Sequence, residues 1–211
     1  MKFYQVLDDL LGQHSKVKIL RYLCQTRLEM SGRRIAKDLG LSPWACHLAL
    51  RQLTDQGVLT MRNVGRTCLF CLNEGNYVAA KLLLPLFTGE AHLLQNAIEE
   101  LTAGLDKSII SVILYGSVAR KQEHPFSDLD LVVLVPSDAS RKKVRALFES
   151  SEESFIARFG NRLSPLILPV AEFRKRYRNR DPLIMDVVNT GRVVSGQLIT
   201  EVIRHGAQKD S

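Results

Sequence analysis

The sequence lacks long hydrophobic segments, since no apolar run in its 211 residues approaches the roughly 20 residues that a membrane-spanning helix needs. Residues 1–13 carry acidic side chains within their apolar stretch, which is not the pattern of a signal peptide. Cysteine is also scarce, and four in a chain of this length do not indicate a disulfide framework. These absences predict a cytoplasmic protein with no membrane partner.

Two of the four cysteines, Cys68 and Cys71, have the spacing of half a zinc-binding knuckle. The pair falls in a predicted strand, where residues three apart point to opposite faces of the sheet. No second pair of ligands with such spacing is evident in the sequence. We therefore interpret the cysteines as buried free thiols.

Positive charge is in excess, with a net charge of +7 and a pI of about 9.4. Residues 1–75 contain eleven Lys or Arg against six Asp or Glu, and a second basic run covers 174–180. A hydrophobic content of 45% is ordinary for a globular protein, so the charge bears on binding and not on fold. It predicts a polyanionic partner such as DNA.

Helical periodicity dominates the first third of the chain. Apolar residues at helical spacing predict helices over 3–11 and 14–25, followed by two more over 31–40 and 42–56 in a helix-turn-helix arrangement. Two strand-like runs within 58–72 surround a glycine and predict a β-hairpin. The helix from 42 is expected to bury Cys46, Leu50 and Leu53.

This order of elements, over about residues 14–73, resembles the winged-helix family of transcription regulators. The resemblance implies that the helix from Ser42 enters the major groove of DNA and that the hairpin reaches the backbone or minor groove. Trp44 and Leu48 make the exposed stripe apolar for a DNA reader, so a module that binds protein is the alternative. The residues expected to contact DNA are Arg33, Arg34, Ser42, Trp44, His47, Arg51, Arg62 and Arg66.

Residues 76–104 are helical by pattern and are expected to form a linker. Pro85 should kink or break the first part, and Thr88-Gly89-Glu90 falls between the two apolar segments, so one or two helices are expected. Long apolar helices between two domains commonly need a partner, so we expect a homodimer.

The segment 108–135 contains the candidate residues for binding an anion and a metal ion. A β-branched apolar run ends at Gly116-Ser117, where the chain can turn and begin a helix that runs towards Arg120. Such a junction presents backbone N–H groups and a hydroxyl to an anion. In the next apolar run, Asp128 and Asp130 project to the same side of a strand, and a divalent metal with oxygen ligands would relieve their repulsion.

The segments GSVAR at 116–120 and SDLDL at 127–131 resemble the signature of the DNA polymerase beta nucleotidyltransferase superfamily, in its minimal branch. The resemblance implies transfer of a nucleoside monophosphate from a triphosphate to a hydroxyl acceptor, with a protein as one candidate acceptor. It implies Mg²⁺ or Mn²⁺ as the cofactor and ATP as the expected triphosphate. Asp128 and Asp130 would be the metal ligands and catalytic residues, and Gly116, Ser117 and Arg120 would bind the phosphates.

Two positions depart from the pattern of that superfamily. The third carboxylate, expected on the following strand, is missing from 163–168, where Ser164 takes its place, and Glu172 lies beyond the strand. Lys121 occupies a position that is often glycine. The alternative to an enzyme is therefore a transcriptional regulator whose degenerate domain binds a nucleotide or a partner without catalysis.

The expected fold is α+β, with an N-terminal winged helix-turn-helix, a helical linker and a C-terminal nucleotidyltransferase fold of a mixed sheet with flanking helices. The expected domains are 1–75, 76–106 and 107–204. After the central strands the pattern predicts a crossover helix to about 159, an edge strand over 161–170, a helix over 183–188, a short strand over 191–196 and a frayed tail after about 204.

Overall fold

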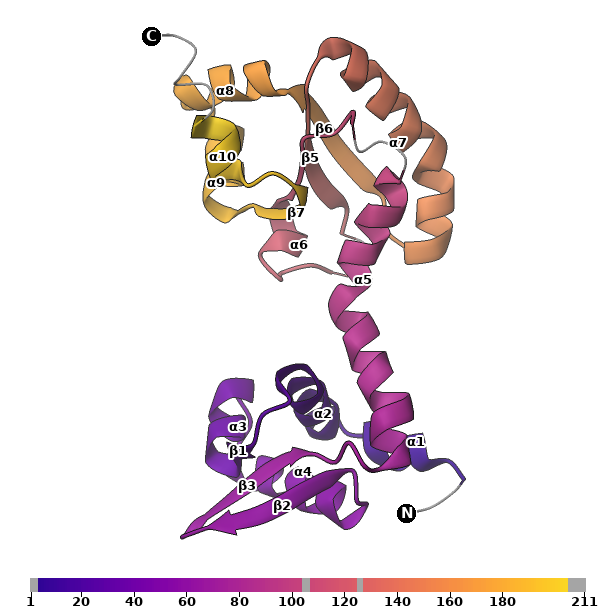
Figure 1. Ribbon diagram of the computed structural model, residues 1–211, viewed down its shortest axis with the longest axis vertical. Coiled ribbons are helices and arrows are strands. Elements are labelled where there is room, and N and C mark those ends of the chain that lie inside the picture. The colour runs from indigo at the N-terminus through magenta and orange to yellow at the C-terminus, as the bar shows by residue number, and fades with distance from the viewer. Residues whose placement is uncertain (1–3, 104–106, 125–126, 205–211) are drawn as a thin grey trace. The chain divides into compact units, whose positions relative to one another are not determined.

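The computed structural model describes residues 4–103, 107–124 and 127–204, and its architecture is α+β as predicted (Figure 1). Internal contacts divide the chain into two compact units, one up to Leu93 and one from Leu94 onward, which are described in turn. None of the helices in the described ranges is long and apolar enough to cross a membrane.

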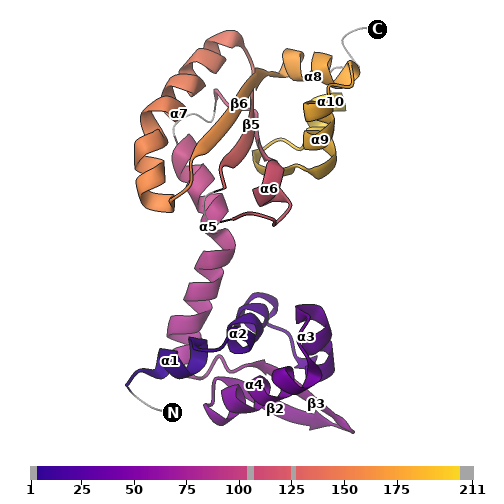
Figure 2. The ribbon, with the colours of Figure 1, turned by 180° about the vertical axis from the view of Figure 1, so that it is seen from behind.

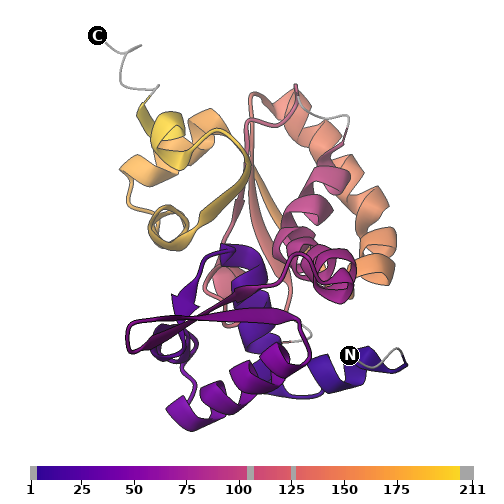
Figure 3. The ribbon, with the colours of Figure 1, turned by 60° about the horizontal axis from the view of Figure 1, so that its bottom comes forward.

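The first unit combines helices with a three-stranded antiparallel sheet in the order β1-β3-β2. Its elements are α1 (Val6–Leu11), α2 (His14–Thr26), β1 (Met30–Ser31), α3 (Gly32–Leu39), α4 (Pro43–Asp55), β2 (Leu59–Val64) and β3 (Thr67–Leu72). β2 and β3 run side by side as a hairpin (Figure 3), and Gly65, with φ of +59°, allows its tight turn. The predicted helix-turn-helix with a hairpin is confirmed.

The ends of the two central helices follow from their capping residues. Ser31 accepts a hydrogen bond from the backbone N–H of Arg34 (3.3 Å), and Ser42 accepts one from Ala45 (3.2 Å). Gly40 ends α3 in the left-handed conformation. The predicted buried face of α4 is confirmed, because Cys46, Leu50 and Leu53 all lie in the core.

The prediction of buried cysteines is correct for Cys24 and Cys46 and wrong for the pair on β3. Cys68 is exposed and Cys71 is half-buried. Cys68 belongs to the first, outer residues of β3, which extend past the core, and Cys71 points to the opposite face from the buried Phe70 and Leu72. Both thiols are free.

Of the one or two helices expected in the linker, the structure shows a continuous helix across residues 88–90. A π-helix, η1 (Ala79–Leu83), continues directly into α5 (Leu84–Thr102), which runs through Gly89 without interruption. Pro85 falls in the first turn of α5, directly after the wider π turn. That turn accommodates the missing N–H and the ring of proline.

The second unit is built on a four-stranded mixed sheet in the order β6-β5-β4-β7. After the end of α5 its elements are β4 (Ser111–Leu114), α6 (Gly116–Ala119), β5 (Leu129–Val135), α7 (Asp138–Phe159), β6 (Leu163–Pro169), α8 (Val170–Arg178), α9 (Pro182–Thr190), β7 (Arg192–Gly196) and α10 (Ile199–Arg204). β5 and β6 are parallel and joined by α7, and β6 lies at an edge, as predicted. α10 was not predicted, and the tail after 204 lies outside the described residues.

Helices cover both faces of this sheet (Figures 1 and 2). One face packs on the end of α5 and on α7, and the other packs on α8, α9 and α10. Successive residues of β5 alternate between these cores, so that Leu131 and Val133 face α7 whereas Val132 and Leu134 face α8 and α9. Asp130 therefore lies on the face of α8–α10, at the start of the strand.

Candidate functional site

The candidate site is built where β4 ends and α6 begins. Tyr115, between the two elements, donates its backbone N–H to the carbonyl of Asp130 (3.0 Å). Gly116 follows with φ of +72°, and a Cβ added there would lie 2.2 Å from Oδ2 of Asp130. Any side chain at 116 would displace that carboxylate, so the Asp130 carboxylate and the start of α6 can approach each other only because 116 is glycine.

Asp130 also has a neighbour in the next strand. Its register partner in β6 is Ser164, and residues paired in adjacent strands share a face of the sheet. The Ser164 side chain acts to lower the pKa of the Asp130 carboxylate. Asp128 directly precedes β5 and is exposed.

The electrostatics of this cluster favour a cation. Partial burial, and then the negative charge of Asp128, raise the pKa of Asp130 above its ordinary value. The Ser164 side chain and the charge of Arg120 act in the opposite direction. Burial, Asp130 and Asp186 in turn raise the pKa of the Tyr115 hydroxyl. Burial and the neighbouring carboxylate thus both disfavour the charged form of Asp130, which a bound cation would stabilise.

One charged residue of the site was missed by the sequence analysis. Asp186 projects from α9 and accepts a hydrogen bond from Arg120 (3.5 Å). Both side chains are 42% exposed. No local pattern marks Asp186 in the sequence, because only the packing of α9 against α6 brings it near the carboxylates.

The two aspartates fit a divalent ion if other molecules supply the rest of its ligands. Carboxylate oxygens suit Mg²⁺, which proteins often hold through one or two carboxylates together with water and substrate phosphates. Within the part of the chain that the structure describes, no group of three or more His, Cys, Asp or Glu could hold a metal ion. Asp128 and Asp130 would therefore hold an ion whose remaining ligands come from a nucleotide and water.

The structure also shows what stands at the two departures from the superfamily pattern. Ser164, paired with Asp130, occupies the position beside it on the next strand. Glu172 lies on α8, past the far end of β6, and bonds Arg141 and Arg176. Lys121 has φ of +56°, a left-handed conformation that explains why glycine suits that position.

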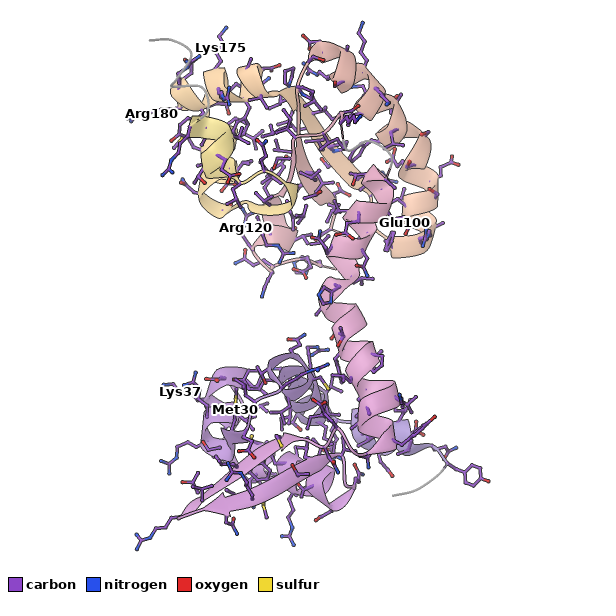
Figure 4. All side chains as sticks on the ribbon, in the orientation of Figure 1. Met30, Lys37, Glu100, Arg120, Lys175 and Arg180 are labelled. Carbon is purple, nitrogen blue, oxygen red and sulfur yellow. The ribbon has the colours of Figure 1, made fainter. Side chains whose placement is uncertain are left out.

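The basic run at 174–180 lies away from these carboxylates. α8 follows the C-terminal end of β6, whereas Ser164 and Asp130 lie at the N-terminal ends of the parallel strands. In Figure 4, Lys175 and Arg180 lie by α8, and Arg120 lies by α6 at the other end of this unit. The run therefore does not belong to the candidate site.

In the first unit, several residues predicted to contact DNA line a groove of about 780 Å³ between α3, the start of α4 and the hairpin. Arg33, His47 and Arg66 are among them. Lys37, which the sequence analysis did not select, also lines the groove and projects from α3 (Figure 4). The groove thus combines three cationic side chains with an imidazole.

The remaining predicted contacts lie outside this groove. Arg34 is paired with Asp38 (2.6 Å), and Arg62 donates to Glu29 (2.7 Å), so both charges are already neutralised. Trp44 is 74% exposed on α4. The other residues of this group that lie on the surface are Ser42 and Arg51.

A mixed sheet that carries paired carboxylates beside a Gly-Ser junction is typical of domains that handle nucleotides together with metal ions. Residues 96–193 match the family described as "Nucleotidyltransferase domain". This match agrees with the nucleotidyltransferase resemblance predicted from the sequence.

Solved structures show weaker similarities. The AntR antimony-specific transcriptional repressor is 18% identical, over 44% of this chain and 78% of that chain, with a TM-score of 0.36. A homodimeric winged helix-turn-helix DNA-binding domain from Mycobacterium bovis is 20% identical, over 43% and 86%, with a TM-score of 0.34. A toxin–antitoxin crystallised with AMP-PNP is 15% identical, over 54% and 87%, with a TM-score of 0.34. No curated protein matches the chain.

Proposed function

We propose that this chain transfers a nucleoside monophosphate from a nucleoside triphosphate to a hydroxyl group and binds DNA through its first unit. The observation that carries the proposed reaction is the close fit between Gly116 and the Asp130 carboxylate. A Cβ added at 116 would lie only 2.2 Å from Oδ2 of Asp130. This fit supports the proposal, because the carboxylate that would hold the metal lies against the junction that would bind phosphate. Metal and phosphate are then neighbours, as nucleotidyl transfer requires.

Each residue of the site has a part in this reaction. Asp128 and Asp130 would hold Mg²⁺ or Mn²⁺, which when bound neutralises phosphate charge. The Ser117 hydroxyl donates to a phosphate oxygen, and Arg120, which lies 3.5 Å from Asp186, would exchange that partner for a phosphate. The acceptor oxygen bonds to the α-phosphorus of the triphosphate, for which ATP is the expected source, and pyrophosphate leaves with the electrons of the broken bond.

The DNA-binding part of the proposal rests on the groove of the first unit. Among the described residues, no ion pair engages Arg33, Lys37 or Arg66, so all three are free to neutralise phosphates. A homodimer is the expected assembly, because exposed leucines recur on one face of η1 and α5. They are Leu82, Leu86 and Leu93.

The reaction is tested by incubating the full chain with Mg²⁺ or Mn²⁺ and ATP labelled at the α-phosphate, alone and with candidate acceptors. Label from the α-position should become covalently attached to a macromolecule, and label from the γ-position should not. The double variant Asp128→Ala/Asp130→Ala should lose the transfer. A matched pair of exposed acids on α7, Glu149→Ala/Glu153→Ala, should retain it.

The second candidate function is a DNA-binding regulator that binds a nucleotide without turnover. The observation that favours it is Ser164 in the place of a third acid. Nucleotide binding that depends on Asp128 and Asp130, without transfer of the α-label to any acceptor, would support this regulator and contradict the enzyme.

A further inference from the structure

The Ser164 hydroxyl is the feature of the site that neither the metal nor the phosphates require. Ser164 lies on β6, at the edge of the sheet, and is exposed. Its register pairing with Asp130 places both side chains on the same face of neighbouring strands, which are about 4.8 Å apart. Asp130 is thus a neighbour of Gly116, where a Cβ would lie 2.2 Å from its Oδ2, and of Ser164, its register partner.

This position is where an acceptor hydroxyl has to be. A triphosphate bound through an ion on Asp128 and Asp130 must lie next to those carboxylates. Attack on phosphorus requires an oxygen about 3–3.5 Å away and correctly aligned. Ser164, the register partner of Asp130 on the exposed edge strand, brings a hydroxyl to the same face of the sheet as that carboxylate.

We propose that Ser164 is itself a nucleotide acceptor, so that the chain attaches a nucleoside monophosphate to its own Ser164. Oγ of Ser164 forms a bond to the α-phosphorus of a nucleoside triphosphate bound with a divalent cation. The bond from the α-phosphorus to the bridging oxygen breaks, and pyrophosphate leaves. The hydroxyl proton passes to water, and Ser164 becomes a phosphodiester.

Other hydroxyls near Asp130 are less suited to this role. Tyr115 is half-buried, whereas Ser164 is exposed. Ser117 lies on α6 at the phosphate-binding junction, where its hydroxyl is used for binding. Ser164 alone of these three combines exposure with a register pairing to Asp130.

The test is intact-mass spectrometry of the full chain after incubation with Mg²⁺ or Mn²⁺ and ATP, followed by peptide mapping. Wild type should gain the mass of one nucleoside monophosphate less one water, and the modified peptide should contain Ser164. Ser164→Ala should lose the adduct, whereas Ser164→Thr, which keeps the hydroxyl, should regain it at a lower rate. Ser150→Ala, a serine on α7, should behave as wild type.

Nucleotide binding, measured by calorimetry on the same variants, separates this inference from the proposed function on which it rests. If ATP binds to wild type and Ser164→Ala alike and no adduct forms on Ser164, self-modification is wrong and nucleotide binding stands. Transfer of label to an added acceptor by Ser164→Ala, with no adduct on wild type, overturns only the inference. An adduct that persists in Ser164→Ala also overturns it, and absence of ATP binding by wild type overturns both.

Discussion

Gly116 is the residue on which the geometry of the site depends most. Two features exclude other residues at this position, for separate reasons. The backbone φ is +72°, and an added Cβ would lie 2.2 Å from Oδ2 of Asp130. The first reason is backbone strain, and the second is displacement of the carboxylate that would hold the ion.

Gly116→Ala is expected to destabilise the second unit by about 1–3 kcal/mol and to abolish nucleotide binding. Gly160, which ends α7 with φ of +79° and has open space at its Cβ, is the matched control. Gly160→Ala should cost a similar strain of about 1–2 kcal/mol and leave nucleotide binding unchanged. Thermal melting and calorimetry with ATP measure the two effects, and equal loss of binding in both variants would contradict the assignment.

Asp130→Asn is expected to raise the Tm of the metal-free protein at neutral pH. The pKa of Asp130 is raised in the folded state, so the folded protein holds this proton more tightly than the unfolded chain and ionisation costs stability. This loss of stability is absent below pH 3.8, the ordinary pKa of the carboxyl, because Asp130 is then protonated in both the folded and the unfolded state. It grows as the pH rises above that value. Melting in EDTA from acidic to neutral pH should show a gain that vanishes at the acidic end. A variant less stable than wild type at neutral pH would contradict this.

At the scale of elements, α5 shows where local signals mislead. Pro85 and Gly89 predict a break, yet the helix is continuous. Phe87, on one side of Gly89, is 3% exposed, and Glu90, on the other side, bonds Arg21 of α2 at 2.6 Å. These tertiary contacts stabilise the helical conformation on both sides of Gly89, and the local sequence does not reveal them.

Gly89→Ala is therefore expected to stabilise the protein, by about 0.5–1 kcal/mol, because Gly89 is helical and nothing lies within 4 Å of an added Cβ. Gly40→Ala is the contrasting variant, since Gly40 has equally open space but a φ of +61°. It should destabilise by about 1–2 kcal/mol. Chemical denaturation of the full chain distinguishes them, and a destabilising Gly89→Ala would show that α5 does not persist in solution.

Sequence patterns predicted the parts of the site that are local in the chain. The Gly-Ser junction and the alternation of Asp128 and Asp130 lie within one segment of 28 residues, and periodicity alone placed the two aspartates on one face. Asp186 and Lys37 could not be found this way, because their neighbours are distant in the sequence. Folding brings Asp186 of α9 to Arg120, and Lys37 of α3 to the groove that Arg66 of the hairpin also lines. The exposure of Cys68 likewise depends on how far the hairpin extends past the core.

At the scale of the whole molecule, two units with separate cores should carry separable binding functions. DNA affinity should fall steeply with salt, and Arg33→Gln or Arg66→Gln should each lower the slope of log K against log salt by about 1. Lys142→Gln, on α7, should leave the slope unchanged. Fluorescence polarisation across a salt series measures this, and equal slopes for all variants would contradict the groove as the DNA site.

The central claim is that Asp128 and Asp130 hold a divalent ion together with a nucleotide. Electron paramagnetic resonance of Mn²⁺ titrated into the full chain, with and without a non-hydrolysable ATP analogue, tests it most directly. We predict that the analogue tightens Mn²⁺ binding to wild type and that Asp128→Asn/Asp130→Asn abolishes this effect, whereas Glu149→Gln/Glu153→Gln retains it. Nucleotide-dependent Mn²⁺ binding of equal strength in the Asp128/Asp130 variant would contradict the claim.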